Sequence, residues 1–291
     1  MESNDLLSRI NLTYKTLSKG QRLLADYIAG NYDKAAFITA ARMGSIVGVS
    51  ESTVVRFSYA LGYDGYPELQ RALQNMIRNK LTAVQRIKLN SEMDENDVLK
   101  SVLKADMQNI RLTTENIDND AFQEALSALE GAKHIYIVGL RSAAPLAQLL
   151  SYYLNFILDN VVLVSAGMSD IYESMLRINA DDVCIGISFP RYSTRTVDAL
   201  RFAKDHNAKI IAITDALHSP IAKLADYPLI ARSDMVSFAD SLVAPLSLIN
   251  ALIVALSLRN QEKVCEHFNI LESIWGTQKV YMAENHNNQV F

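Results

Sequence analysis

The amino-acid sequence predicts an α+β chain of two domains, in which a small all-helical domain precedes a larger α/β domain. Residues 1–80 carry apolar side chains at helical spacing, interrupted by Gly and Ser where helices end and begin. From His134 onward, short apolar runs alternate with helical stretches, which is typical of a parallel sheet with helices on both faces. Residues 81–100 turn polar and acidic, and we interpret them as a linker. The second domain then spans 101–291, with its core at about 130–260.

Residues 39–62 predict two short helices joined by a tight turn, a helix-turn-helix. Thr39 and Ser50 are good N-caps, because their hydroxyls can accept from a free backbone N–H in the first turn. Gly48 lies between the helices and tolerates the left-handed backbone that ends a helix. Gly44 lies where the helices would cross, and its small size lets them approach. The residues expected to face inward are Ala40, Ala41, Met43, Ile46 and Val47 in the first helix and Val54, Phe57 and Leu61 in the second.

The second of these helices keeps a polar face near its N-terminus. Ser52, Thr53 and Arg56 lie on that face, directly after the cap residue Ser50. Recognition helices present such side chains to base edges and phosphates. We therefore predict that these four residues contact DNA. The alternative is an ordinary helical hairpin with a solvated polar face.

Further helices are expected to brace this motif. Residues 5–17 form a short amphipathic lead-in, and Ser18 with Gln21 matches a capping box. Pro67 stands at the first position of another helix, where proline is well tolerated. In the helix after Ser18, the residues predicted to face inward are Leu23, Leu24, Tyr27 and Ile28. Residues 1–80 thus form a unit of about five helices.

Charge is unevenly distributed along the chain. The net charge is −4, yet residues 1–90 hold 12 Lys and Arg against 7 Asp and Glu, a balance of +5. Residues 91–291 hold the other 16 against 25, a balance of −9. The basic excess therefore coincides with the helix-turn-helix, as phosphate neutralisation requires.

The second domain opens with helical periodicity over 98–129. Near-continuous apolar strands are expected at 134–139, 160–164, 182–188, 208–214 and 227–231. Helices are expected at 142–158, 169–178, 193–206, 219–224 and 241–258, while 260–291 is less regular. This alternation predicts a five-stranded parallel sheet.

Two loops that follow strands carry hydroxyl groups and arginines. In a parallel sheet, ligands bind beyond the carboxyl ends of the strands, where 139–145 (GLRSAAP) and 188–196 (SFPRYSTRT) lie. Both loops lead into helices, whose N-termini favour anions. The candidate ligand-binding residues are Arg141, Ser142, Ser188, Arg191, Ser193 and Thr194, with added charge from Arg195. The alternative is that the hydroxyls only cap helices.

Several classes of protein are disfavoured. No apolar run reaches the ~20 residues of a membrane helix, so no membrane partner is expected. The N-terminus is not a secretory signal. Cys184 and Cys265 form no zinc-type cluster, and the loop after Gly139 lacks a GxGxxG fingerprint, so we expect no metal or cofactor. A reducing, cytoplasmic setting fits best.

These motifs together resemble the RpiR family of bacterial transcriptional regulators, which join a helix-turn-helix domain to a SIS (sugar isomerase) domain. Residues 48–70 (GVSESTVVRFSYALGYDGYPELQ) carry the most specific part, and 219–231 and 242–256 also match SIS patterns. The resemblance implies operator DNA and a sugar-phosphate effector as partners, and a homodimer or tetramer. The family loops usually read GxGSS and SxSGxT; here Arg141 replaces the second Gly and Pro190-Arg191 replaces Ser-Gly.

Two functions remain to be weighed. The first is a ligand-responsive DNA-binding regulator without enzyme activity; the alternative is a sugar-phosphate isomerase on the SIS fold. An isomerase needs a base beside the substrate carbonyl, for which His134, His206 and His218 are candidates. The helix-turn-helix, which an isomerase does not need, favours the regulator. The helix at 242–258 is apolar on nearly every side, which predicts at least a dimer.

Overall fold

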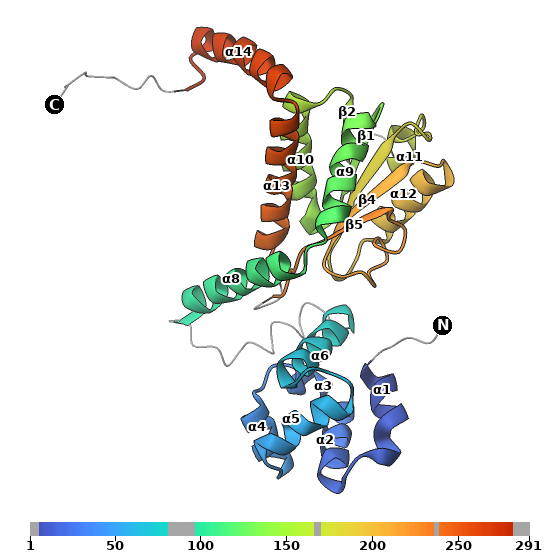
Figure 1. Ribbon diagram of the computed structural model, residues 1–291, viewed down its shortest axis with the longest axis vertical. Helices are drawn as coiled ribbons and strands as arrows, with labels where there is room; N and C mark the ends of the chain where they lie inside the picture. Colours follow the sequence, from blue (N-terminus) through green and yellow to red (C-terminus); the bar gives the residue numbers. More distant parts are fainter. Residues whose placement is uncertain (1–5, 81–96, 166–169, 236–238, 282–291) are drawn as a thin grey trace, which may run out of the picture. The chain divides into compact units, whose positions relative to one another are not determined.

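A computed structural model describes residues 6–80, 97–165, 170–235 and 239–281. The chain divides into two compact units, with the boundary between Leu99 and Lys100 (Figure 1). Most of the predicted linker at 81–100 lies outside the described residues. Its last residues begin a helix, since α8 starts at Val98.

The first unit is all-helical and has one helix more than expected. The chain forms α1 (Leu6–Thr13), a 3-10 turn (Tyr14–Thr16), α2 (Lys19–Gly30), α3 (Tyr32–Ala35), α4 (Ala40–Val47), α5 (Glu51–Ala60) and α6 (Tyr66–Lys80). The one-turn α3 was not predicted. The capping box is confirmed: the Ser18 N–H donates to Gln21 Oε1 at 2.9 Å, and the Gln21 N–H donates to Ser18 Oγ at 3.4 Å.

The core of this unit lies between α2, α4, α5 and α6. Its fully buried side chains include Leu24, Ile28, Met43, Val54, Phe57, Leu69 and Leu73. Three predicted core residues are exposed instead, among them Leu23, which is 46% exposed, and Ile46, which is 45% exposed. Each helix packs against neighbours on one side only, so a single stripe is buried, and Leu23 and Ile46 lie beside that stripe. Ala41 is exposed for the same reason.

The second unit is built on a five-stranded, fully parallel sheet, as predicted. The strands are β1 (Ile135–Gly139), β2 (Val161–Val164), β3 (Val183–Ile187), β4 (Lys209–Thr214) and β5 (Tyr227–Ile230), in the order β2-β1-β3-β4-β5. Alternate residues of β1 to β4 pack into two hydrophobic clusters, one on each face, and β5 contributes to one of them. One face is covered by α9 (Asn119–Gly131), α10 (Ala144–Ile157) and α13 (Val243–Arg259), the other by α11 (Ile171–Ser174) and α12 (Thr194–Asp205).

Three expectations in this unit are wrong. The stretch 219–224 forms consecutive turns rather than a helix, because Ser219 caps only one turn, with Ala222 N–H donating to its Oγ at 3.1 Å. The helix expected at 169–178 is only the single turn of α11. Conversely, the region after 260, expected to be irregular, forms α14 (Gln261–Gln278).

Helix α14 owes its place to contacts with α10 that no local pattern reveals. The ring of Phe268 lies 5.5 Å from that of Phe156, and His267 Nδ1 lies 2.9 Å from the Phe156 carbonyl oxygen. Trp275 packs edge-on against Tyr281 at 5.3 Å. Within the described residues, no single helix is long and apolar enough to cross a membrane; α13 and α14 meet that criterion only together, across a bend of 100°.

Candidate functional site

The turn between α4 and α5 is held by its backbone. Gly48 adopts φ +80°, and the N–H groups of Gly48 and Val49 both donate to the Gly44 carbonyl at 2.9 Å. Ser50 then caps α5, its Oγ accepting from the Thr53 N–H at 3.3 Å. Gly44 itself packs directly on the turn: a β carbon there would lie 2.7 Å from the Val49 carbonyl oxygen. These contacts fix α5 against α4 as a helix-turn-helix.

The predicted DNA-contacting residues divide into two groups. Ser50 Oγ lies 2.8 Å from Thr53 Oγ1 and 2.9 Å from Ser52 Oγ, so the cap and its neighbours form one hydroxyl cluster at the start of α5. Arg56 lies one turn on and is exposed; its Nε donates to the Ser52 carbonyl at 3.2 Å. Ser52 and Arg56 therefore share an outward face, while Thr53 is half-buried.

Two further exposed residues of the motif were not among the predicted contacts. Tyr59 is 58% exposed and continues the face of Ser52 and Arg56 at i, i+4, i+7 spacing. Arg42 is exposed on α4, the first helix of the motif. The helical spacing from Ser52 could have identified Tyr59.

In the second unit, the two polar loops meet at neighbouring strand ends. Strands β1 and β3 pair side by side, and β2 lies on the far side of β1, so the strand order reverses between β1 and β3. That reversal is where ligands bind in open parallel sheets. A pocket of about 420 Å³ lies there, lined by Leu140, Arg141 and the consecutive residues 191–195.

Four of the six predicted ligand residues line this pocket, namely Arg141, Arg191, Ser193 and Thr194. Ser142 is exposed in the 3-10 turn Arg141–Ala143 and does not line it. Ser188 is buried beneath the loop, where its Oγ accepts from the Ser193 N–H at 3.3 Å. Ser193 caps α12 by accepting from the Thr196 N–H at 3.3 Å. Tyr192, a lining residue that the sequence analysis missed, extends the set.

The backbone at the pocket has an unusual conformation. Arg141 and Arg191 adopt φ +57° and +65°, the left-handed region that glycine favours. Each such arginine costs about 1–2 kcal/mol. Strain of this kind is commonly retained at ligand sites. Both arginines are exposed, whereas Arg195 pairs with Asp170, with Nη2 2.7 Å from Oδ1.

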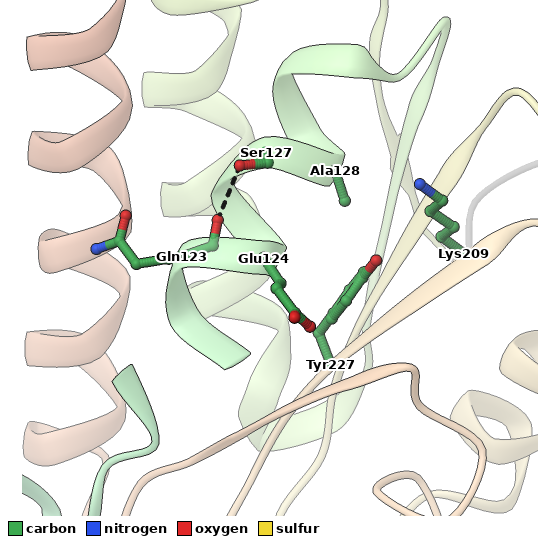
Figure 2. A pocket seen from close by; sticks show the side chains of 6 residues that line it. All are labelled: Gln123, Glu124, Ser127, Ala128, Lys209 and Tyr227. Atoms are coloured by element: carbon green, nitrogen blue, oxygen red, sulfur yellow. Dashed lines mark hydrogen bonds between the residues drawn. The ribbon is translucent and has the colours of Figure 1, made fainter. Parts of the chain in front are cut away.

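A second pocket, of about 460 Å³, lies at the amino ends of β4 and β5 beside α9 (Figure 2). Glu124 extends toward Tyr227, and Ser127 donates to the Gln123 carbonyl at 3.0 Å. Lys209 begins β4 on the other side of the pocket. None of the predicted ligand residues lines it.

The three candidate isomerase bases lie at different places in the second unit. His134 precedes β1 at the amino edge of the sheet, with Nδ1 2.9 Å from Asp182 Oδ1. His206 follows α12 at the same edge, with Nδ1 2.8 Å from the Phe202 carbonyl oxygen. His218 is exposed in the turns after β4. None of the three lines the pocket at the carboxyl ends.

Comparisons with known proteins agree with this architecture. Residues 4–80 match the model of a helix-turn-helix domain, rpiR family, and residues 128–255 match that of the SIS domain. An uncharacterized HTH-type transcriptional regulator of Haemophilus influenzae is 27% identical, over 79% of this chain and 80% of its own. The HTH-type transcriptional regulator HexR of Escherichia coli is 26% identical, over 89% of this chain and 90% of its own.

Two solved structures share the fold. The sugar isomerase domain of an RpiR transcription factor from Sphaerobacter thermophilus is 26% identical, covers 61% of this chain and 99% of its own, and has a TM-score of 0.59. Vibrio vulnificus NanR, solved in complex with ManNAc-6P, is 21% identical, covers 93% of this chain and 99% of its own, and has a TM-score of 0.56. The chain therefore belongs to the RpiR family of transcriptional regulators, with a DNA-binding helix-turn-helix domain followed by a SIS domain.

Proposed function

We propose that this regulator senses an anionic carbohydrate derivative, a sugar phosphate in the first instance, in the pocket between β1 and β3. The observation that carries the proposal is the convergence of Arg141, Arg191 and the N-terminus of α12 on one pocket. An arginine fork and free helix N–H groups suit phosphate better than a neutral sugar. NanR, a structural neighbour, was solved with ManNAc-6P. Ser193 and Thr194, which line the pocket, would supply hydroxyls.

We propose that the outer face of α5 binds operator DNA. Ser50, Ser52, Thr53 and Arg56 lie at its N-terminal end, where recognition helices meet base edges. Such a role places the protein with the chromosome, in the cytoplasm. Effector binding would alter operator affinity by favouring one arrangement of the DNA-binding units through the linker at 81–100. By linkage, operator DNA must then change effector affinity by the same factor.

The experiment that tests this function measures both activities on one preparation. Operator affinity is determined by mobility shift with and without each member of a panel of sugar phosphates and sugar acids. Isomerase turnover of the same compounds is assayed in parallel. We expect one compound to change operator affinity and none to be turned over. Turnover with no effect on DNA binding would establish the isomerase instead. The catalytic base would then have to be a residue other than the three histidines, or lie outside this pocket.

Arg56→Ala is expected to weaken operator binding by about 1–3 kcal/mol, the usual value of a base contact, while leaving the fold intact. Arg56 is exposed, and among the described residues its guanidinium bonds along its own helix, to Ser52, so its removal disturbs no core contact there. The matched control is Arg71→Ala on α6, whose Nε likewise donates to a carbonyl one turn back, that of Pro67. Equal operator affinity in both variants would remove Arg56 from the interface.

We also propose that the protein is at least a dimer through the α/β unit, using α13. Val254 is 57% exposed and Leu258 is 69% exposed on this helix, more apolar surface than a solvated helix usually presents. A two-fold dimer would read a palindromic operator. Sedimentation at micromolar concentration should show a dimer or tetramer, and Leu258→Glu should shift it toward monomer. A monomeric wild type would contradict the proposal.

A further inference from the structure

We propose that Asn109 and Thr113 on α8 (Val98–Asn116) are positioning residues that couple the pocket between β1 and β3 to the helix that follows the linker. The inference rests on the effector site proposed above, and it names the hydrogen bonds through which ligand binding there would change the position of α8. The route is a series of hydrogen bonds along the carboxyl ends of β4 and β5. All of its members lie in the second unit.

The route starts at the pocket. Tyr192 lines the pocket, and its hydroxyl donates to Asp215 Oδ1 at 2.8 Å. Asp215 directly follows β4 and is only 5% exposed. The same oxygen accepts from the Thr214 hydroxyl at 3.3 Å. The loop that carries Arg191 is therefore fastened to the end of β4, and a ligand that moves Tyr192 changes the environment of a buried carboxylate.

The route continues from β4 to β5 and on to α8. The Ala231 N–H donates to the Thr214 carbonyl at 2.8 Å, which ties the chain after β5 to the end of β4. The next N–H, that of Arg232, donates to Thr113 Oγ1 on α8 at 2.9 Å. Hydrogen bonds thus connect the pocket loop to the end of β4, the end of β4 to the chain after β5, and that chain to α8.

A second attachment lies one turn earlier on α8. The Asn109 side chain pairs with both backbone groups of Asp234: Nδ2 donates to the carbonyl at 2.8 Å, and Oδ1 accepts from the N–H at 3.1 Å. Asn109 is 1% exposed. A buried amide that satisfies both polar groups of one residue fixes the position of the helix along that segment, because any sliding would leave these groups unpaired. The Arg232–Asp234 ion pair, 2.8 Å from Nη2 to Oδ2, holds the segment itself.

The exposure of apolar residues on α8 shows why this polar attachment matters. Leu99, Leu103 and Met107 are 70%, 54% and 70% exposed, so the apolar residues of α8 contribute little to holding it on the domain. The helix is held chiefly through Asp106, Asn109 and Thr113, which lie on one face; Asp106 Oδ1 accepts from the Ser241 hydroxyl at 2.6 Å. A shift of the segment after β5 is therefore passed to α8 rather than absorbed by packing.

The test compares two neighbouring threonines of the full-length protein. Thr113→Val removes the acceptor for the Arg232 N–H and keeps the shape of the side chain. Thr114→Val is the matched control, since the Thr114 hydroxyl is exposed and, among the described residues, donates to the Ile110 carbonyl of its own helix. Operator affinity is measured with DNA selected by the wild-type protein, at zero and at saturating inorganic phosphate and constant ionic strength. Phosphate binding is measured by calorimetry.

We expect Thr113→Val to bind phosphate like the wild type. The coupling factor, which is the ratio of operator affinities with and without phosphate, should move toward one by about 2-fold to 30-fold. Thr114→Val should keep the wild-type factor. Asn109→Leu, which removes both bonds to Asp234, should behave as Thr113→Val does. Wild-type coupling in a folded Thr113→Val protein would overturn this inference alone. A wild-type protein that does not bind phosphate would overturn the proposed effector site, and one that binds it without any effect on operator affinity would overturn the coupling route.

Discussion

Gly44→Ala is expected to destabilise the N-terminal unit severely and to abolish operator binding. The new methyl group would lie 2.7 Å from the Val49 carbonyl oxygen and 3.3 Å from the Glu51 nitrogen, so it would meet backbone that cannot rotate away. The turn is also held by two N–H bonds to the Gly44 carbonyl. Relief requires α4 and α5 to separate, at a cost of about 1–3 kcal/mol or more. Urea denaturation followed by circular dichroism measures the loss.

Gly30→Ala is the matched control for this prediction. Gly30 ends α2, and a β carbon there meets nothing within 4 Å. The same substitution is therefore expected to stabilise the unit slightly, by about 0.5–1 kcal/mol, because alanine loses less backbone entropy on folding. Opposite signs for the two variants would confirm that Gly44 is required by close packing. A Gly44→Ala protein as stable as Gly30→Ala would show that the turn can relax.

Arg191→Gly is expected to weaken anion binding without lowering the free energy of unfolding. Removing the guanidinium should weaken the affinity for inorganic phosphate or a sugar phosphate by about 10- to 100-fold, since a charge-assisted hydrogen bond contributes about 1.5–3 kcal/mol. Unfolding should not become easier, because glycine adopts φ +65° without the penalty that arginine bears. Calorimetry and thermal unfolding measure the two effects.

Two companions make this result interpretable. Arg191→Ala removes the same charge but keeps a β carbon in the left-handed conformation, so it should lose similar affinity and be about 1 kcal/mol less stable than Arg191→Gly. Arg201→Ala removes an arginine from the exposed side of α12, where it pairs with Asp198 at 2.9 Å, and should bind like the wild type. Equal anion affinity in Arg191→Gly and Arg201→Ala would move the effector site elsewhere.

The sequence by itself was sufficient for the elements whose stability is local or whose burial is uniform. The caps Ser18, Thr39 and Ser50 act within one turn of the chain, and the structure places each as predicted. The strands are apolar along their length because a central parallel sheet is covered on both faces, so their positions and type could be read directly. The two polar loops, 139–145 and 188–196, could be located for a related reason, since the carboxyl ends of parallel strands share one edge.

Tertiary structure alone decided the features that depend on contacts between elements distant in sequence. Leu23 is apolar yet exposed, because no described neighbour covers that side of α2. Helix α14 packs against α10 through the contact of Phe268 with Phe156. The left-handed φ of Arg141 and Arg191 follows from loop closure at the ends of β1 and β3, which no local pattern of arginines encodes. The pairing of Asn109 with Asp234 joins residues far apart in the chain, so only the folded domain brings this buried amide to the backbone groups that it pairs with.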